Sequence, residues 1–301
     1  MLILQKFKIM KKIIALLSFI ALTVVSCSKN DDPVPTASVG NLIKRVESIS
    51  NSPDGNSTTF ISYNGSKINE VTSTDGGVAR KTIYTYTGDL ITKTQTFKGT
   101  VLTDSDDYVY VNSKLMSVLS VENRINFQTN VLEENKSKIE YTYNPNGTVT
   151  EQVYALVGTV YVPETRTNVY TYSAGNCIKL VQNSSNTYDN GSGTLQTTTS
   201  VYTYIYEYDN KSNPFTNITG FMKIVFDEDF SANNLIKTTS SSSSSTNGVP
   251  NTVFPVTVRD YVLSYNTKNL ITEKKYDFVY TTGFNPVVTE TRTSFIKYFY
   301  E

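Results

Sequence analysis

The sequence contains no histidine and no tryptophan, and it has only two cysteines among 301 residues. Without histidine, Ser-His-Asp and Cys-His nucleophiles, HExxH zinc sites and histidine acid–base groups are all excluded. Glycine-rich phosphate-binding stretches of the Walker or dinucleotide type are also missing from the sequence. Carboxylate chemistry alone stays open, as a pair of acidic residues for glycoside hydrolysis or as oxygen ligands for Ca²⁺. We therefore expect no cofactor and a protein that is not an enzyme.

Positive charge is scarce once the N-terminal segment is set aside. Residues 1–26 hold four lysines and no acidic residue, which leaves 23 basic against 27 acidic residues from position 27 onward, a net charge of −4. No block of Lys and Arg remains in that part of the sequence. Nucleic acid is recognised first through clustered positive charge, so we expect no nucleic-acid partner.

The N-terminal segment has the composition of a secretory signal peptide. A basic region precedes an uncharged run over residues 13–25, which is too short for a membrane-spanning helix of about 20 residues. A short apolar run that ends in small residues is typical of a signal peptide. We predict a signal peptide over residues 1–26, with Met10 as an alternative start of the chain.

The end of this segment, Val24–Cys27 or VVSC, resembles the lipobox of bacterial lipoproteins. In that family the cysteine thiol receives a diacylglycerol, the peptide before it is removed, and the new amino terminus receives a further acyl chain. Several acyl chains hold a protein on a membrane stably, whereas one chain does so only marginally. The resemblance implies that Cys27 is the lipidation site and that the membrane is a partner through this anchor. A plain signal peptide with a chance cysteine is the alternative.

A polar tether is expected after the anchor, over residues 27–41. Its first part, Ser28–Asp32 or SKNDD, resembles the short acidic signal that directs Bacteroidota lipoproteins to the outer face of the outer membrane. The resemblance implies an outer-membrane protein that faces the cell exterior. A solvated tether would have a similar polar composition whichever way the protein faces.

One short unit recurs along the rest of the chain. A predicted strand ends in aromatic-x-Tyr, a turn of polar residues or glycine follows, and an aliphatic residue opens the next strand. The second tyrosines of these units are Tyr63, Tyr86, Tyr110, Tyr143, Tyr172, Tyr208 and Tyr265. Alternation along a strand places both tyrosines of a unit on one face, and the turns contain residues that accept positive φ. We predict stacked hairpins whose tyrosine pairs become cross-strand aromatic neighbours and pack the sheet.

These units predict an all-β fold: an antiparallel up-and-down meander of roughly fifteen or more strands, curled or closed into a soluble barrel-like sheet. Strands such as Lys81–Tyr86 carry Lys or Thr on both faces, which disfavours an apolar surface toward lipid. We expect a single domain over residues 42–301, because the repeat resumes after an irregular segment at Pro214–Asn234. A serine-rich stretch near residues 240–248 is predicted to be a mobile loop.

The repeat resembles the YD-type repeat of RHS and teneurin shells over roughly residues 42–280, although Tyr208 and Asp209 alone keep the Tyr-Asp step. The chain also resembles uncharacterised secreted and surface lipoproteins of Bacteroidota. That resemblance lies in the lipobox, the Tyr-x-Tyr hairpins and two segments, Tyr206–Phe215 and Ser231–Lys237. It implies a porin-like β-meander and an address in the cell envelope, and it implies no chemistry.

Two acidic clusters are the remaining candidates for a site: Asp104–Asp107, expected between two strands, and Asp227–Asp229, in the irregular segment. Both lack the glycine and the distal glutamate of an EF-hand, which argues against a calcium loop of that type. Whether either cluster binds calcium in another way stays open. The separation of two carboxylates, which decides glycosidase chemistry, is a property of the folded chain. The other cysteine, Cys177, is expected to be a buried apolar thiol without a disulfide partner.

We expect a non-catalytic binding or structural lipoprotein of the envelope, with a glycan or a protein as its ligand. A carboxylate-dependent hydrolase acting on polysaccharide is one alternative. A carrier of lipids or small molecules is another, and it would need an apolar lumen.

Overall fold

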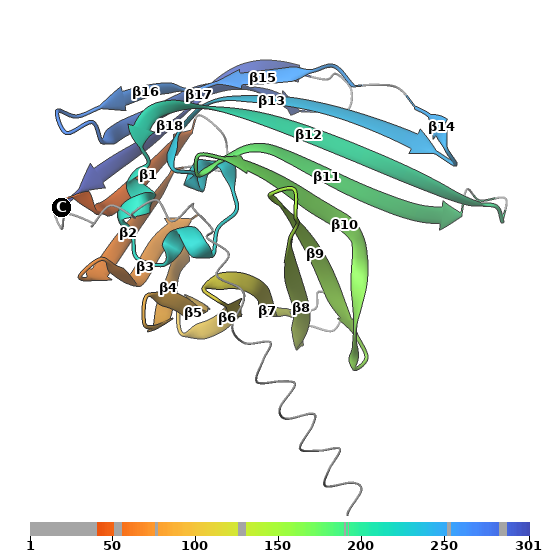
Figure 1. Ribbon diagram of the computed structural model, residues 1–301, viewed down its shortest axis with the longest axis horizontal. Coiled ribbons are helices and arrows are strands. Elements are labelled where there is room, and N and C mark those ends of the chain that lie inside the picture. Colours follow the sequence, from red (N-terminus) through yellow and green to blue (C-terminus); the bar gives the residue numbers. More distant parts are fainter. Residues whose placement is uncertain are drawn as a thin grey trace, which may run out of the picture. The chain divides into compact units, whose positions relative to one another are not determined.

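The computed structural model describes residues 41–50, 56–75, 78–125, 131–189, 191, 193–251, 254–282 and 288–301. Most of these residues form eighteen strands of one sheet in which the paired strands are antiparallel (Figure 1), so the all-β meander is confirmed. The predicted signal peptide and Cys27 lie outside the described residues. Among the residues that are described, no helix has both the length and the apolar character needed to cross a membrane.

The strands lengthen toward the middle of the chain. The first nine are β1 (Ile43–Ser50), β2 (Ser57–Asn64), β3 (Lys67–Asp75), β4 (Val78–Thr87), β5 (Leu90–Lys98), β6 (Val101–Val111), β7 (Lys114–Ile125), β8 (Leu132–Tyr143) and β9 (Thr148–Val157). The others are β10 (Val160–Ser173), β11 (Asn176–Asp189), β12 (Leu195–Ser212), β13 (Asn233–Thr246), β14 (Val249–Pro250), β15 (Thr257–Asp260), β16 (Val262–Tyr265), β17 (Ile271–Thr282) and β18 (Val288–Tyr300).

The sheet curls back toward its own start. Each strand from β1 to β13 pairs with the next, and β1 pairs with the last strand, β18, as well as with β2. The ring of pairings is interrupted at Tyr261, because β15 pairs with β13 on one side while β16 pairs with β17 on the other. The prediction left a curled and a closed sheet as alternatives. The structure shows the curled one, because its ladders do not form an unbroken ring.

The repeated hairpin has a constant register. The second tyrosine of a unit lies opposite the aliphatic residue that opens the next strand, as in the pairs Tyr86–Ile91 and Tyr110–Leu115. The first tyrosine of a unit also lies opposite a non-aromatic residue, as Tyr84 lies opposite Thr94. The predicted cross-strand tyrosine pairs are therefore wrong in these hairpins, because a tyrosine-bearing strand alternates with an aliphatic one.

Tyrosine hydroxyls connect several of the strands to the strand before them. Five second or terminal tyrosines donate to a backbone carbonyl of that strand: Tyr63 to Ile43 (2.7 Å), Tyr110 to Ile91 (2.7 Å), Tyr143 to Leu115 (3.0 Å), Tyr208 to Cys177 (2.7 Å) and Tyr300 to Ile271 (2.6 Å). A bond of this kind contributes about 1 kcal/mol net. Burial raises the pKa of Tyr110 to about 12, so its hydroxyl keeps the proton that it donates.

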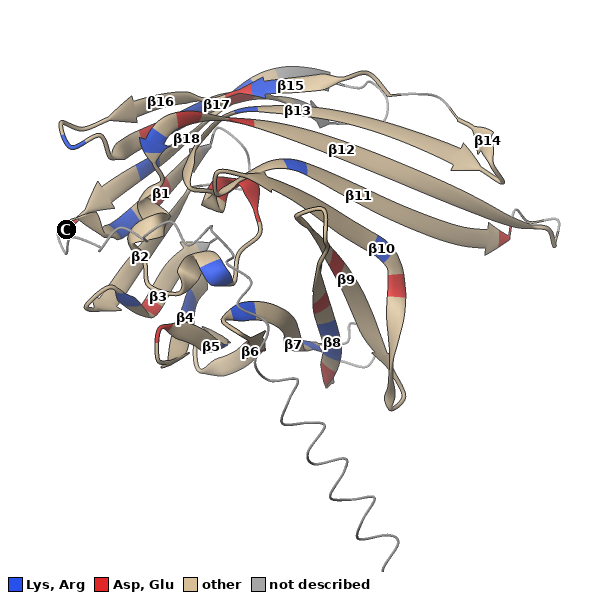
Figure 2. Ribbon diagram, in the orientation of Figure 1, with Lys and Arg blue, Asp and Glu red and all other residues tan. Residues whose placement is uncertain are grey.

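Charged residues of both signs are interspersed along the strands (Figure 2). Many form ion pairs between neighbouring strands, such as Lys93 with Asp107 at 3.0 Å and Lys237 with Glu207 at 3.0 Å. These pairs lie on the face of the sheet that points away from the tyrosines of the Tyr-x-Tyr units, because side chains alternate along a strand. We call this face the outer face.

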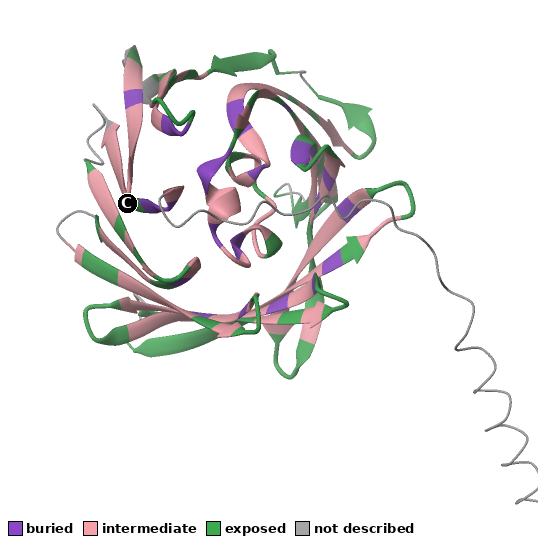
Figure 3. Ribbon diagram, turned by 60° about the vertical axis from the view of Figure 1, so that its left-hand side comes forward, coloured by how far each residue is buried: buried purple, intermediate pink, exposed green. Residues whose placement is uncertain are grey.

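The opposite, inner face packs against residues 213–232, which we call the inner segment. It contains three short 3₁₀ helices, η2 (Pro214–Asn217), η3 (Phe221–Lys223) and η4 (Glu228–Phe230), and lies within the curl of the sheet (Figure 3). Its Phe221 packs with strand residues Ile68 and Ile91 in a buried cluster. The predicted irregular segment is therefore present, and it supplies part of the core.

An ion pair and a close backbone approach fix the inner segment in place. Lys274 of β17, only 5% exposed, forms an ion pair with Asp229 and lies 4.1 Å from the ring centre of Tyr261. At Gly220, φ is +75° and an added Cβ would lie 2.6 Å from the carbonyl oxygen of Asp89. A side chain at position 220 is therefore excluded both by the backbone conformation and by the close approach of the β4–β5 turn.

The serine-rich stretch is a strand, so the prediction of a mobile loop at residues 240–248 is wrong for most of its length. Residues 240–246 belong to β13 and pair with β12, with Ser240 opposite Tyr204. A strand ladder needs main-chain donors and acceptors, which serine provides as well as any residue, and β12 supplies the aromatic side chains. Only the turn at Asn247 and Gly248, both with positive φ, matches the prediction.

Candidate functional site

The main candidate site is a cavity of about 480 Å³ between the inner segment and the inner face of strands β8 to β12. We call it the inner cavity. Its lining comprises Tyr141, Glu151, Tyr170, Leu180, Gln182, Tyr204, Tyr206, Ile224, Phe226, Asp227 and Glu228. The strands supply alternate residues on one face, so the Tyr-x-Tyr pattern itself places pairs of rings toward this space.

Flat aromatic surfaces form a large part of the lining. The Phe226 ring of the inner segment stacks on Tyr141 with 4.4 Å between centroids and an angle of 18°, and its centroid lies 5.8 Å from that of Tyr170. On β12, the rings of Tyr204 and Tyr206 are parallel within 5°, with centroids 6.4 Å apart. Tyr206 is buried and Tyr204 is half-buried, so Tyr204 is the more accessible of the two.

A carboxylate and two amides lie beside these rings. Glu151 accepts hydrogen bonds from the Asn168 side-chain nitrogen at 2.6 Å and from the Tyr170 hydroxyl at 3.1 Å. Asn168 lies opposite both Glu151 and Gln182 in the ladders, so all three side chains share the inner face. Asn168 is 6% exposed, and its side-chain oxygen has no hydrogen-bond partner.

Two further carboxyl groups come from the inner segment. The pKa of Glu228 is raised to about 8, first by burial and then by a hydrogen bond with the Asp227 carboxyl and by its charge. Glu228 therefore keeps its proton at neutral pH, while Asp227 is exposed. Burial also raises the pKa of the nearby Cys177 thiol to about 12. Cys177 is 1% exposed and free, so the prediction of a buried, unpaired thiol is confirmed.

The acidic cluster 227–229 is divided by the structure. Asp227 and Glu228 line the inner cavity, whereas Asp229 pairs with Lys274. Sequence reasoning identified this cluster but missed Glu151 as its counterpart, because an isolated glutamate in a strand carries no signal of its own.

The other acidic cluster, residues 104–107, lies within β6 and not between strands as expected. Alternation along the strand sends Asp106 to the inner face, where it accepts from the Ser120 hydroxyl at 2.6 Å, and Asp107 to the outer face, where it pairs with Lys93. Asp106 and Asp107 therefore point to opposite faces of the sheet. Across the part of the chain that the structure describes, no group of three or more Asp, Glu, Cys or His residues could hold a metal ion.

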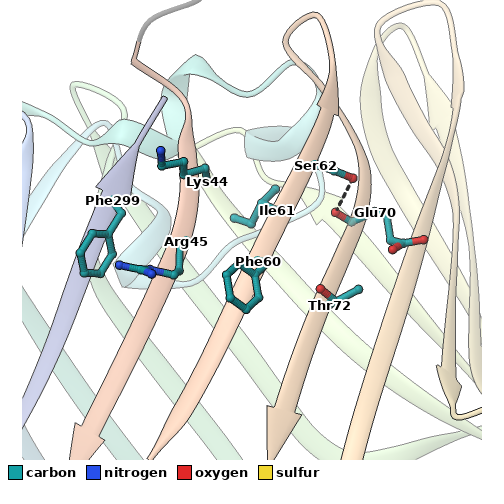
Figure 4. Close-up of a pocket in the computed structure, with 8 residues that line it drawn as sticks. All are labelled: Lys44, Arg45, Phe60, Ile61, Ser62, Glu70, Thr72 and Phe299. Atoms are coloured by element: carbon teal, nitrogen blue, oxygen red, sulfur yellow. Dashed lines mark hydrogen bonds between the residues drawn. The ribbon is translucent and has the colours of Figure 1, made fainter.

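A second hollow, of about 450 Å³, lies on the outer face over β18, β1, β2 and β3 (Figure 4). Its lining consists of Lys44, Arg45, Phe60, Ile61, Ser62, Glu70, Thr72 and Phe299. The Arg45 guanidinium lies over the Phe299 ring at 3.8 Å and forms an ion pair with Glu47 at 3.3 Å. Arg45 and Glu70 thus already have charged partners outside the lining, and we regard the inner cavity as the stronger candidate.

Comparison with known proteins shows a remote structural likeness. No family model matches the sequence, and no curated protein matches it. Among solved structures, the chain is similar to a porin-like protein from Bacteroides uniformis, with 11% identity and a TM-score of 0.43. The match covers 89% of this chain and 100% of that chain. A likeness at this level carries no argument about function.

Proposed function

We propose that this protein is a lipid-anchored protein of the outer membrane that faces the cell exterior and binds a glycan, without catalysis, in the inner cavity. The observation that carries the binding proposal is the lining of that cavity, where tyrosine rings lie beside carboxyl and amide groups. Sugar rings present an apolar face that stacks on an aromatic ring and hydroxyls that bond to such polar groups. The anchor is proposed from the sequence VVSC alone.

The individual contacts support a ligand of this kind. The parallel rings of Tyr204 and Tyr206 offer a stacking surface, and Gln182 and Glu151 offer acceptors and donors for hydroxyls. The volume of about 480 Å³ falls within the range of small-molecule sites. Carboxyl groups in the lining make a lipid carrier the weaker alternative, since a lipid tail gains nothing from them.

Binding is tested by glycan arrays, followed by calorimetry on the full chain in mild detergent. We expect wild-type protein to bind at least one glycan class and Tyr204→Ala to lose most of that affinity. Tyr154, which lies on the outer face of β9, provides the matched control, and Tyr154→Ala should bind as wild type does. Absence of any glycan binding, or equal loss in both variants, contradicts the proposal.

The anchor is tested by labelling with a radioactive or clickable fatty acid in a bacterial host. Wild-type chain and Cys177→Ala should both carry the label and sediment with the outer membrane. Cys27→Ala should carry no label and should leave that fraction. Labelling that survives in Cys27→Ala contradicts the anchor, and protease treatment of whole cells separately tests whether the protein faces outward.

One observation favours a second candidate, a glycoside hydrolase. Glu228, with its raised pKa, and Glu151 line the same cavity, and a protonated carboxyl beside a second one is the arrangement such enzymes use. Release of new reducing ends from a bound glycan by wild type, and its loss in Glu228→Gln, would establish this function. No release, with binding retained, leaves the non-catalytic proposal in place.

A further inference from the structure

The inner cavity combines three carboxyl groups with aromatic rings and lacks a cationic side chain among the described residues that line it. The carboxyl groups of Glu151, Asp227 and Glu228 come from two different elements, β9 and the inner segment. Ion pairs with Lys do occur on the outer face of two strands that line the cavity, within β8 and between Glu207 of β12 and Lys237 of β13. The missing counter-charge is therefore a property of this cavity and not of the whole sheet.

We propose that the ligand of the inner cavity is an amino sugar with a free, protonated amine, whose ammonium group binds between Glu151 and the Asp227–Glu228 pair. This inference rests on the glycan site proposed above and names its ligand class. An ammonium group donates three hydrogen bonds, and such bonds to carboxylates are shorter and stronger than neutral ones.

The aromatic part of the cavity suits the same group. A cation over the face of an aromatic ring is attracted by its quadrupole, and the attraction grows when the site is shielded from water. The centroid of the Phe226 ring lies 4.4 Å from that of Tyr141 and 5.8 Å from that of Tyr170. These rings lie at the side of the cavity where Glu151 accepts a hydrogen bond from the Tyr170 hydroxyl. Rings and carboxylate thus lie together, which is the arrangement that distinguishes an amine from a hydroxyl.

An independent observation points to a donor in the ligand. The Asn168 side-chain oxygen has no hydrogen-bond partner although the residue is 94% buried, and its nitrogen is already bonded to Glu151. Leaving a buried acceptor unpaired costs free energy. Its ladder neighbours Glu151 and Gln182 both line the cavity. Asn168 is not itself a lining residue, so this unpaired acceptor lies beside the proposed ammonium site and does not by itself define it.

The experiment is calorimetry on the full chain with three β-1,4-linked disaccharides that differ at one substituent. Chitobiose with free amines, cellobiose with hydroxyls and diacetylchitobiose with acetamides share the same ring stacking. We expect the free amine to bind at least about tenfold tighter than the other two, since a hydrogen bond to a charged group is stronger than a neutral one. Raised salt should narrow this difference.

Two variants and a control assign the preference. Glu151→Gln keeps the size and shape of the side chain and removes its charge. Asp227→Asn changes an exposed residue, so this variant should fold as wild type does. Each should reduce the preference for chitobiose over cellobiose about tenfold. Glu207→Gln, on the outer face of β12, should change neither.

The outcomes separate the two proposals. If cellobiose and diacetylchitobiose bind as tightly as chitobiose, the amine inference is overturned and the glycan site stands. If chitobiose binds tighter but Asp227→Asn and Glu151→Gln both keep the full preference, the inference is also overturned, because the amine then binds elsewhere. If none of the three binds and the glycan array is empty as well, the glycan site itself fails.

Discussion

Replacement of Glu228 by glutamine should remove a pH-dependent loss of stability from this protein. In the folded chain the pKa of Glu228 is raised from 4.5 to about 8, with burial as the largest cause and Asp227 as the next. Between these two pH values the unfolded chain loses the proton while the folded chain keeps it. The folded state is therefore fully favoured by this group below about pH 4.5, and that advantage is lost as the pH rises to about 8.

The size of the effect follows from the shift. Each pKa unit corresponds to about 1.4 kcal/mol, so Glu228 should lower the free energy of unfolding by a few kcal/mol between about pH 5 and pH 8.5. The groups that face Glu228 are Asp227 and Asp229 of the inner segment, Cys177 of β11, and Tyr206 and Tyr208 of β12. Burial raises the pKa of the thiol to about 12 and raises the pKa of each of the two tyrosines above its ordinary value, so these groups stay protonated across this range.

The assay is urea unfolding of the full chain, followed by far-ultraviolet circular dichroism because the sequence has no tryptophan. Glu228→Gln should unfold with nearly the same free energy at both pH values, while wild type should be less stable at the higher one. Glu207→Gln, on the exposed outer face, should keep the wild-type slope. A wild-type chain equally stable at both pH values, or a variant with the same slope, would refute the reasoning.

Three other predictions concern the packing of the sheet and the inner segment, each measured as a change in the free energy of unfolding. Tyr110→Phe should cost about 1 kcal/mol, because it removes a hydroxyl that donates to the neighbouring strand. Asp229→Asn should cost about 3 kcal/mol by leaving a buried ammonium unpaired, and Lys274→Met should cost less, since the carboxylate it leaves is half-exposed. Equal costs would contradict this asymmetry. Gly220→Ala should cost at least twice as much as Gly248→Ala, which has a positive φ but open space around it.

The local rules of the fold could be predicted from the sequence because they act over a few residues. Alternation places Tyr108 and Tyr110 on one face, and Gly65 and Gly88 allow the positive φ of tight turns. Pairing of each tyrosine with the aliphatic residue across the turn follows from turn length. These signals repeat along the chain, and the meander of hairpins follows from them.

Predictions from residue composition alone were wrong where the structure of a segment depends on the strand with which it pairs. The serines of residues 240–245 suggest a loop because their side chains are too small and polar to pack in a core. They nevertheless form a strand, because the neighbouring strand β12 supplies the aromatic side chains. The tyrosine pairs were expected to meet one another, and they meet aliphatic and threonine residues instead, since they lie on alternate strands. In both cases the partner strand decided the outcome.

The sequence by itself determined the hairpin unit, its turns and the side of each strand that carries tyrosine, because these depend on neighbours in the chain. Only the tertiary structure decided that the sheet curls around the inner segment and that Glu151 of β9 shares a cavity with Glu228. The curl sums small twists over eighteen strands, and the position of the inner segment depends on contacts with Lys274 and the β4–β5 turn. Those contacts join residues far apart in the chain, which no local pattern records.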